Sequence, residues 1–179
     1  MNTKPPGGWP EDLRYITRNI YSKQLNAAEF EKIGVDKNCQ PQPPAQKPSK
    51  LVKIRQINDP KHPAHGQNGL FAATKLQPKT HIIDYLGYVH PDRESDPSSD
   101  YDLKLDKETG VGVDAQRFGT EARMVNDYRG IMNRPNVFFD NRIVGGELRM
   151  AIFVAENPIP KGTELCINYG KGFWNARTS

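Results

Sequence analysis

The fold is decided near the C-terminus, by the stretch GTELCINYGKGFW at residues 162–174. Its first two residues predict a turn, and the apolar residues after them predict a short strand. Three aromatic residues, Tyr169, Phe173 and Trp174, then fall within six positions, with glycines between them that let the backbone approach another group closely. Alone, this pattern fits either a closing strand whose rings cap a core or the wall of a binding site. The preceding segments decide between the two.

Composition indicates one folded domain, or one domain with an N-terminal extension, in a chain of 179 residues. The net charge of +4 is compatible with acidic partners but equally with an ordinary basic surface, so it does not indicate nucleic-acid binding. The two cysteines form no CxxC pair or zinc cluster, so we expect no metal. Neither a signal peptide nor an 18-residue apolar stretch is present, which predicts an intracellular protein without a membrane span.

Residues 1–50 are predicted to form a helical extension followed by a linker. Pro10 and the two acidic residues after it are typical of a helix start, and apolar residues then recur at helical spacing, so we expect one or two helices within 11–32. Residues 36–50 contain four prolines and almost no large apolar residue, which is typical of a linker or an extended arm.

Residues 51–179 are predicted to be mainly β, with few short helices. Short apolar or alternating runs follow one another closely, which favours several small sheets. The expected strands are residues 51–57, 69–73, 81–88, 101–106, 111–114, 137–140 and 147–155, with a short helix within 118–126 and a polar loop at 91–99.

Five segments in order resemble the SET domain of protein lysine methyltransferases. They are HGQNGLFA at 65–72, DYLG at 84–87, VDA with GTEARMVN within 113–126, PN at 135–136, and KGTEL with YG within 161–170. The resemblance covers residues 51–174 and implies the SET β-fold of several small sheets, in which the C-terminal segment closes the structure in a pseudoknot-like arrangement. It also assigns residues 51–179 to the SET domain.

The sequence departs from the family pattern in several places. Gln67 stands at the first glycine position, and the family's Asn-His-Ser is Asn126-Asp127-Tyr128 here. About four extra residues separate Asn126 from Pro135. The cysteine-rich zinc segments that flank many SET domains are absent, so the chain looks most like compact SET proteins, such as the small viral one, that close the site with C-terminal aromatic residues.

The resemblance implies methyl transfer from S-adenosylmethionine to a lysine in an extended basic peptide, a histone tail among the candidates. Free lysine has a pKa of about 10.4, so the amine has to lose a proton before it can attack. An apolar channel favours the neutral amine, and tyrosines supply hydroxyls and aromatic faces that orient it. No metal is required.

The family pattern transfers roles to named residues. Tyr169 and Tyr101 would be catalytic, while Tyr85 and Ile167 would contact the substrate. An aliphatic residue at 167 leaves room for more than one methyl group. S-adenosylmethionine would be bound by Asn68, Gly69, Leu70, Arg123, Asn126, Asp127, Phe173 and Trp174. Arg123 in particular would meet its carboxylate, and a surface arginine is the plain alternative.

The peptide would add as a strand beside residues 84–88 or 101–106. The acidic residues of loop 91–100 would attract a basic peptide, although the sequence favours the plainer explanation of a solvated acidic loop. The four histidines fit no ligand spacing, and we expect them at the surface or at strand ends.

Two other functions compete with the enzyme. Asp127, Tyr128 and Gln67 are compatible with a catalytically inactive SET-like adaptor that binds a peptide or S-adenosylmethionine. A β-rich nucleic-acid binder would need a basic-aromatic stripe, which the sequence lacks. We favour a nuclear location, with the cytoplasm as the alternative; the sequence does not identify the substrate protein or the oligomeric state.

Overall fold

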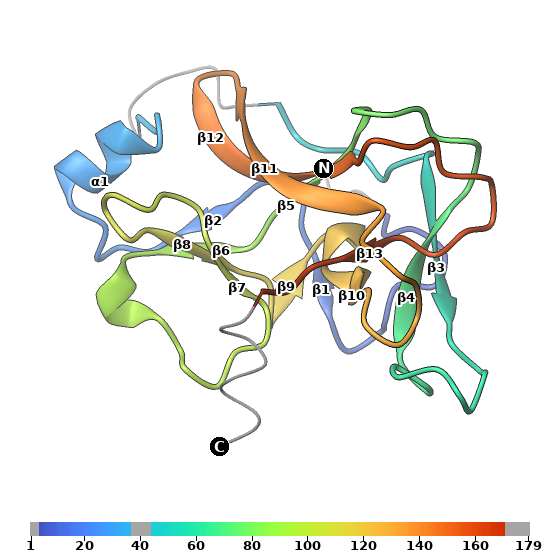
Figure 1. Ribbon diagram of the computed structural model, residues 1–179. Helices are drawn as coiled ribbons and strands as arrows, with labels where there is room; N and C mark the ends of the chain where they lie inside the picture. The colour runs from blue at the N-terminus through green and yellow to red at the C-terminus, as the bar shows by residue number, and fades with distance from the viewer. Residues whose placement is uncertain (1–3, 37–43, 171–179) are drawn as a thin grey trace.

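The computed structural model describes residues 4–36 and 44–170, and shows short strands wrapped around a shared core (Figure 1). The strands are β1 (Arg14–Tyr15), β2 (Ile20–Tyr21), β3 (Val52–Gln56), β4 (Asn68–Ala72), β5 (His81–Tyr85), β6 (Tyr88–His90), β7 (Asp102–Lys104), β8 (Gly112–Asp114), β9 (Phe118–Gly119), β10 (Asn126–Asp127), β11 (Val137–Val144), β12 (Glu147–Val154) and β13 (Cys166–Ile167). The helical segments are α1 (Ala27–Lys32) and the 3-10 turns η1 (Asp92–Glu94) and η2 (Glu121–Met124).

These strands form five small sheets. The two larger ones have the orders β11-β12-β5 and β2-β6-β8-β7, and three pairs, β3-β4, β1-β9 and β10-β13, complete the set. The predicted mainly β fold of several small sheets with few short helices is therefore confirmed. Figure 1 shows the β11–β12 hairpin crossing the molecule between α1 on one side and the β3–β4 pair on the other.

The β11–β12 hairpin is the longest regular element. Gly145 and Gly146 make its turn with φ values of 58° and 91°, a conformation that glycine adopts without strain and that suits a two-residue hairpin loop. Behind the turn, β12 is antiparallel to β5, with Met150 opposite Tyr85 and Ala151 opposite Asp84. The hairpin thereby fixes the position of β5, which carries one of the predicted site tyrosines.

The core runs through elements from both ends of the chain. Leu70 on β4, Leu86 after β5, Ile152 on β12 and Leu165 before β13 are all fully buried. The removal of apolar surface from water is the main stabilising term in folding. The C-terminal segment therefore helps to stabilise the same core as the first sheets.

The chain closes on itself where the C-terminal segment meets residues 126–136. Strand β13 runs parallel to β10, with Cys166 opposite Asn126. Asn136 fixes the same segment: its backbone N–H donates to the Cys166 carbonyl at 3.1 Å, its Nδ2 donates to the Glu164 carbonyl at 2.8 Å, and its Oδ1 accepts the Cys166 N–H at 2.8 Å. This is the pseudoknot-like closure that the resemblance implies.

The helices predicted within 11–32 are mostly wrong. Only α1 is helical, and it begins at a capping box in which Asn26 and Glu29 exchange side-chain and backbone hydrogen bonds. Upstream, β1 pairs with β9 and β2 with β6, both in parallel. The spacing of apolar residues could not distinguish these extended segments from a helix, because a strand of two residues is too short to show a periodic pattern.

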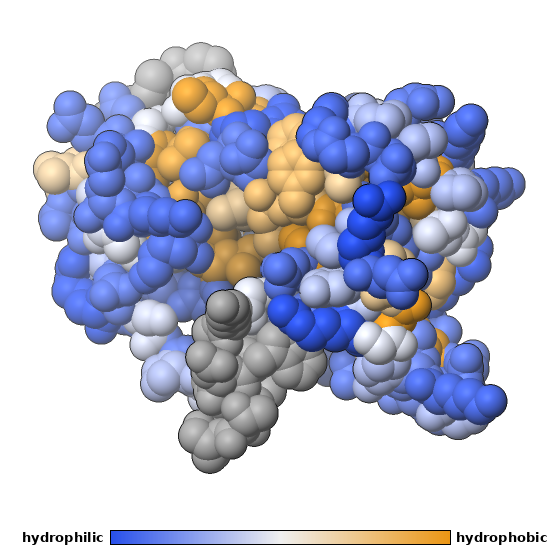
Figure 2. Space-filling model, in the orientation of Figure 1, coloured by the Kyte–Doolittle hydropathy of each residue, from blue (hydrophilic) through white to orange (hydrophobic). Residues whose placement is uncertain are grey.

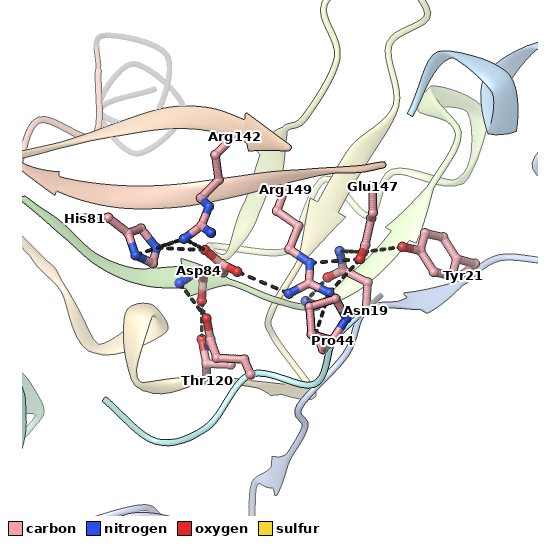
Figure 3. A network of polar contacts seen from close by, with 11 residues as sticks. Asn19, Tyr21, Pro44, His81, Asp84, Thr120, Arg142, Glu147 and Arg149 are labelled. Atoms are coloured by element: carbon pink, nitrogen blue, oxygen red, sulfur yellow. Dashed lines mark hydrogen bonds and ion pairs between the residues drawn. The ribbon is translucent and has the colours of Figure 1, made fainter. Parts of the chain in front are cut away.

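The domain boundary expected at residue 50, between the N-terminal extension and the SET domain, stays a prediction. The N-terminal segment does, however, add strands β1 and β2 to sheets formed by later residues. It also meets a buried ionic network on β5 and β12 (Figure 3). Arg149, only 1% exposed, donates to Glu147 at 2.8 and 2.6 Å and to Asp84 at 3.2 Å. A buried cation of this kind is tolerated because carboxylates on either side satisfy it.

The N-terminal segment completes the hydrogen bonding of that network. Asn19 Nδ2 donates to Glu147 at 2.9 Å, and the Tyr21 hydroxyl donates to the same carboxylate. Gln46 Oε1 accepts the Asp84 N–H at 2.7 Å. Residues before position 50 therefore satisfy polar groups of the two strands that carry the network, which a detached arm would not do.

We expect Asn136→Ala to lower the free energy of unfolding by about 3 kcal/mol, because it leaves the Cys166 N–H and the Glu164 carbonyl without partners in a buried place. Urea denaturation measures this change. The exposed Asn157→Ala is the matched control and should stay within about 0.5 kcal/mol of the wild type. An Asn136→Ala protein as stable as this control would contradict the role given to Asn136.

The lowered pKa of Asp84 leads to a second prediction, about how the stability of the protein changes at acid pH. Burial acts to raise its pKa, but the hydrogen bond from His81 and the charges of Arg142 and Arg149 together lower it below the ordinary value. A carboxyl whose pKa is lowered by folding stabilises the protein above the unfolded pKa of about 3.9, and this stabilisation is lost as the pH falls through the folded value.

Asp84→Asn should therefore be less stable than the wild type by about 3 kcal/mol at neutral pH, and the gap should narrow below about pH 4. Urea unfolding at a series of pH values tests this. A gap that stays constant down to the acid transition would show that the Asp84 charge does not matter.

Candidate active site

Tyr169 lies just after β13, and both its backbone N–H and its side-chain hydroxyl are hydrogen-bonded. Its hydroxyl donates to the Val125 carbonyl at 2.7 Å, and its backbone N–H donates to Asp127 Oδ2 at 2.8 Å. Burial raises its pKa above the ordinary value, and the neighbouring Tyr101 and Asp127 raise it further. The phenol is therefore neutral at physiological pH.

Tyr101 lies beside Tyr169, immediately before β7. The Arg123 guanidinium carbon lies 4.0 Å from the centre of the Tyr101 ring, a cation–π contact. Arg123 is 9% exposed, and its Nε donates to the Ala115 carbonyl at 2.8 Å. The Arg123 guanidinium thus contacts other residues of the protein, Tyr101 and Ala115. Its predicted bond to the carboxylate of S-adenosylmethionine stays a prediction.

Tyr85 is a buried residue that hydrogen-bonds to the backbone of Tyr101. It is 4% exposed, and its hydroxyl donates to the Tyr101 carbonyl at 2.7 Å. Its ring packs edge-on against Phe139 of β11, with centroids 5.4 Å apart. Three tyrosines from β5, from the start of β7 and from the C-terminal segment therefore meet, as the predicted site requires. Tyr85 has the position of an internal brace, and its contact with substrate stays a prediction.

Asn68, Gly69 and Leu70 lie on β4, next to the C-terminal segment. A Cβ at Gly69 would lie 2.9 Å from Glu164 Oε1, so the backbone of β4 and the Glu164 side chain approach each other closely here. Asn126 Nδ2 donates to the same oxygen at 2.9 Å and, at 3.4 Å, to the Asn68 carbonyl. The predicted cofactor residues on β4 and β10 are thus linked through Glu164.

His62 completes that link, with its Nε2 2.9 Å from Glu164 Oε2. The other described pairs of this kind are His81 with Asp84 at 2.8 Å and His90 with Asp102 at 3.1 Å. His81 and His90 lie at strand ends as expected, yet His90 is only 3% exposed. Sequence reasoning missed the His62 and His90 contacts because each joins residues from different loops or strands. His81 and Asp84 are three positions apart on β5, and this spacing does not predict a contact within a strand.

Asp127 lies on β10, opposite Ile167 of β13. Its carboxylate accepts bonds from Arg129 Nη1 at 2.9 and 3.1 Å as well as from the Tyr169 amide. Ile167 is 3% exposed and packs in the core. Arg129 was not among the predicted site residues, because it lies in the segment inserted relative to the family pattern.

Two predicted residues, Phe173 and Trp174, lie outside the described residues. Across residues 4–36 and 44–170, no three His, Cys, Asp or Glu side chains are grouped so as to hold a metal ion. No helix within these ranges is long and apolar enough to cross a membrane.

Residues 67–170, more than half of the chain, match the SET domain family. The chain belongs to this family. The match starts at the glycine turn and ends just after Tyr169, so it contains the three tyrosines, Arg123 and the closure at Asn136.

Among curated relatives, the SET chain is 35% identical over 111 residues to a histone-lysine N-methyltransferase, H3 lysine-36 specific, of Aspergillus fumigatus. It is 32% identical over 119 residues to the protein of the same description in Schizosaccharomyces pombe. These matches cover 56% and 61% of this chain, but the chain spans only 11% and 14% of the two relatives' lengths.

Solved structures give a similar result. A crystal structure of the Chaetomium thermophilum polycomb repressive complex 2 matches 72% of this SET chain and 16% of that chain, with a TM-score of 0.56 and 28% identity. A structure described as ctPRC2 in an autoinhibited conformation bound to S-adenosylmethionine matches 73% of this chain and 16% of that chain, with a TM-score of 0.56 and 27% identity.

The contact between Arg123 and Tyr101 can be tested by Arg123→Lys. Lysine keeps the charge but cannot lay a planar group on the ring or keep the bond to Ala115, so we expect a loss of about 1–2 kcal/mol in the free energy of unfolding. Urea unfolding gives the value, and the near-ultraviolet circular dichroism should change as Tyr101 loosens. Arg117→Lys, at an exposed site, is the control. Equal stability of the two variants would argue against the contact.

Proposed function

We propose that this protein is an S-adenosylmethionine-dependent protein lysine N-methyltransferase that acts on a lysine in an extended basic peptide. The observation that carries the proposal is the tyrosine cluster of a SET-family chain, in which Tyr85 and Tyr169 both lie close to Tyr101. The Arg123 guanidinium packs on the Tyr101 ring of this cluster. The names of the two curated relatives support this reaction and make histones the first substrates to test.

The residues present fit S-adenosylmethionine, which supplies a methyl group on a cationic sulfur when bound. The described site is rich in oxygen atoms and aromatic faces, and such groups favour a cation. Asn68, Gly69 and Leu70 on β4, with Asn126 and Asp127 on β10, would hold it. Phe173 and Trp174 would complete its binding site.

Arg123 is better suited to a supporting role than to binding the cofactor's carboxylate. The guanidinium donates a hydrogen bond to the Ala115 carbonyl and packs on the Tyr101 ring, so it would hold Tyr101 in place. Tyr169 would orient the incoming amine through its neutral hydroxyl, and Tyr101 would line the same channel.

The apolar side chains around the cluster would help deliver a neutral amine. Figure 2 shows apolar residues gathered in a band across the middle of one face, over the β11–β12 hairpin and the neighbouring β6–β8 strands. Leu103, Phe139 and Met150 are half-buried and pack against the core in this region. Such surroundings disfavour the charged ammonium form of lysine. Ile167, an aliphatic residue, would leave room for more than one methyl group.

Charge is distributed in a way that suits a basic peptide. Residues 92–114 carry eight acidic and three basic side chains, a net charge of −5, in a chain whose net charge is +4. Strand β7 lies within this region at the edge of its sheet. A free edge can accept an extended peptide as an added strand, and the surrounding acids would attract basic residues. A histone substrate would place the protein in the nucleus.

The test incubates the protein with labelled S-adenosylmethionine and a panel of histones and basic peptides. The wild type should transfer label to lysine, and Tyr169→Phe should reduce the rate at least about 100-fold because the orienting hydroxyl is lost. Tyr88→Phe is the matched control and should retain activity, since the Tyr88 ring contacts His90 and Phe118, which are not members of the cluster. Mass spectrometry of the product counts the methyl groups.

The outcomes separate the alternatives. Equal labelling by wild type and Tyr169→Phe would remove the role given to Tyr169. Binding of S-adenosylmethionine without transfer to any substrate would replace the enzyme by the adaptor. A product that stays monomethylated in excess S-adenosylmethionine would contradict the room assigned to Ile167. Tight, salt-sensitive binding to nucleic acid with no affinity for S-adenosylmethionine would indicate the nucleic-acid binder.

A further inference from the structure

Asp127 and Arg129 form a pair that the family pattern does not contain, since the family has Asn-His-Ser where this chain has Asn126-Asp127-Tyr128. The Asp127 side chain is 6% exposed and that of Arg129 is 39% exposed. Asp127 accepts the backbone N–H of Arg129 at 2.9 Å in addition to the guanidinium. The carboxylate is therefore buried, ionically paired and held rigidly by its own local turn.

The pair acts where the β10–β13 ladder stops. The last backbone contact of this ladder is the Tyr128 N–H, which donates to the Ile167 carbonyl at 2.9 Å. Beyond it, the Tyr169 amide donates to Asp127 Oδ2 at 2.8 Å, so a side chain supplies the acceptor that the next rung of a strand would have given. The position of Tyr169 along the chain direction is set by this carboxylate.

The other arm of the pair holds the residues on both sides of Tyr169. Arg129 Nη2 lies 3.3 Å from Asn168 Oδ1, and this same oxygen accepts the Gly170 N–H at 2.9 Å. Together with the bond from the Tyr169 hydroxyl to Val125, residues 125–129 contact the tyrosine at its amide, at its hydroxyl and at its neighbour.

The inserted segment supports the pair. The N–H groups of Ile131 and Met132 both donate to the Tyr128 carbonyl, at 3.1 and 3.0 Å, which closes a tight turn. Gly130 has a φ of 79°, and a Cβ there would lie 2.7 Å from Pro63, so the turn is packed against the loop that precedes β4. Arg129 is thereby presented to Asp127 by a turn that packs closely against Pro63.

We propose that Asp127 and Arg129 are positioning residues that fix the catalytic Tyr169, and that Arg129 also neutralises the Asp127 carboxylate so that it does not hold the substrate lysine in its charged form. The proposal rests on the methyltransferase activity proposed above. Its second part follows from charge: a bare carboxylate close to the amine would raise the amine's pKa and oppose the deprotonation that attack requires. The Tyr169 amide lies 2.8 Å from Asp127 Oδ2, so this carboxylate is close to the proposed reaction site.

The first test measures hydrogen exchange of the Tyr169 amide by NMR and needs no activity. Asp127→Ala should speed exchange at least about tenfold, since the amide loses its acceptor. Asp127→Asn keeps an oxygen acceptor and should restore most of the protection. Arg134→Ala, an exposed arginine in the same inserted segment, is the control and should leave exchange unchanged. Unchanged protection in Asp127→Ala overturns the positioning role.

The second test follows kcat against pH with the peptide that the wild type methylates. Arg129→Ala should move the ascending limb up by about one pH unit, because the uncompensated carboxylate favours the ammonium form. The double variant Asp127→Asn with Arg129→Ala should return the limb to the wild-type position, whereas a merely structural defect would lower the rate without moving it. A limb that Arg129→Ala does not move overturns the neutralising role.

The two tests keep the proposals apart. Absence of methyl transfer by the wild type would refute the proposed function, and the neutralising role with it, while the exchange measurement still decides whether Asp127 holds Tyr169. Transfer by the wild type combined with wild-type kcat in Asp127→Ala would refute the positioning role alone. Should Asp127→Ala fail to fold, Arg129→Ala replaces it in the exchange measurement, because it removes the contacts to Asp127 and Asn168. Exchange of the Tyr169 amide as slow as in the wild type then overturns the positioning role of the pair.

Discussion

The passage of residues 164–169 alongside residues 126–136 is the contact on which the rest of the site depends. Asn136 satisfies the backbone of Glu164 and Cys166, and β13 pairs with β10 only because that segment is held in place. Buried backbone groups have to be hydrogen-bonded, so this register has no low-energy alternative. Tyr169 begins where the pairing ends, and its hydroxyl meets Val125 for the same reason. A site built from distant segments thus acquires a rigid frame.

Charge inside the protein is arranged in closed groups. Arg149 lies between Glu147 and Asp84, Arg129 lies on Asp127, and His62 lies on Glu164. A buried charge without a partner is costly. The Arg149–Asp84 and His62–Glu164 pairs also join separate segments of the chain, whereas Arg129 and Asp127 form a local pair. At the proposed reaction centre the same rule has a chemical consequence. A methyl transfer between a cationic sulfur and an amine is sensitive to a stray carboxylate, and the observed pairing of Asp127 limits this effect.

Much of the fold could be predicted from local patterns. The strands β3, β4, β5, β8 and β12 were expected within a few residues of their observed bounds, because alternation and apolar runs persist over three or more residues there. The N-terminal segment was expected to be helical and is largely not. Strands of two residues, such as β1 and β2, are defined by their partners β9 and β6, so their own sequence carries no distinguishing period. The motifs named Tyr169, Tyr101 and Tyr85, and these residues do lie together, while their roles stay predictions.

The sequence by itself determined the family, the mainly β character and the residues of the tyrosine cluster, because motif order and short-range periodicity are written along the chain. Tertiary structure alone decided what those residues touch. It turned Arg123 onto Tyr101, made Tyr85 a brace, and gave the unfamiliar Asp127 a partner in Arg129 and a bond to the Tyr169 amide. The physical reason is that hydrogen bonds and ion pairs depend on distances of about 3 Å in space. Asp127 and Tyr169, which are 42 positions apart in the chain, reach such a distance only once the last strand is in place.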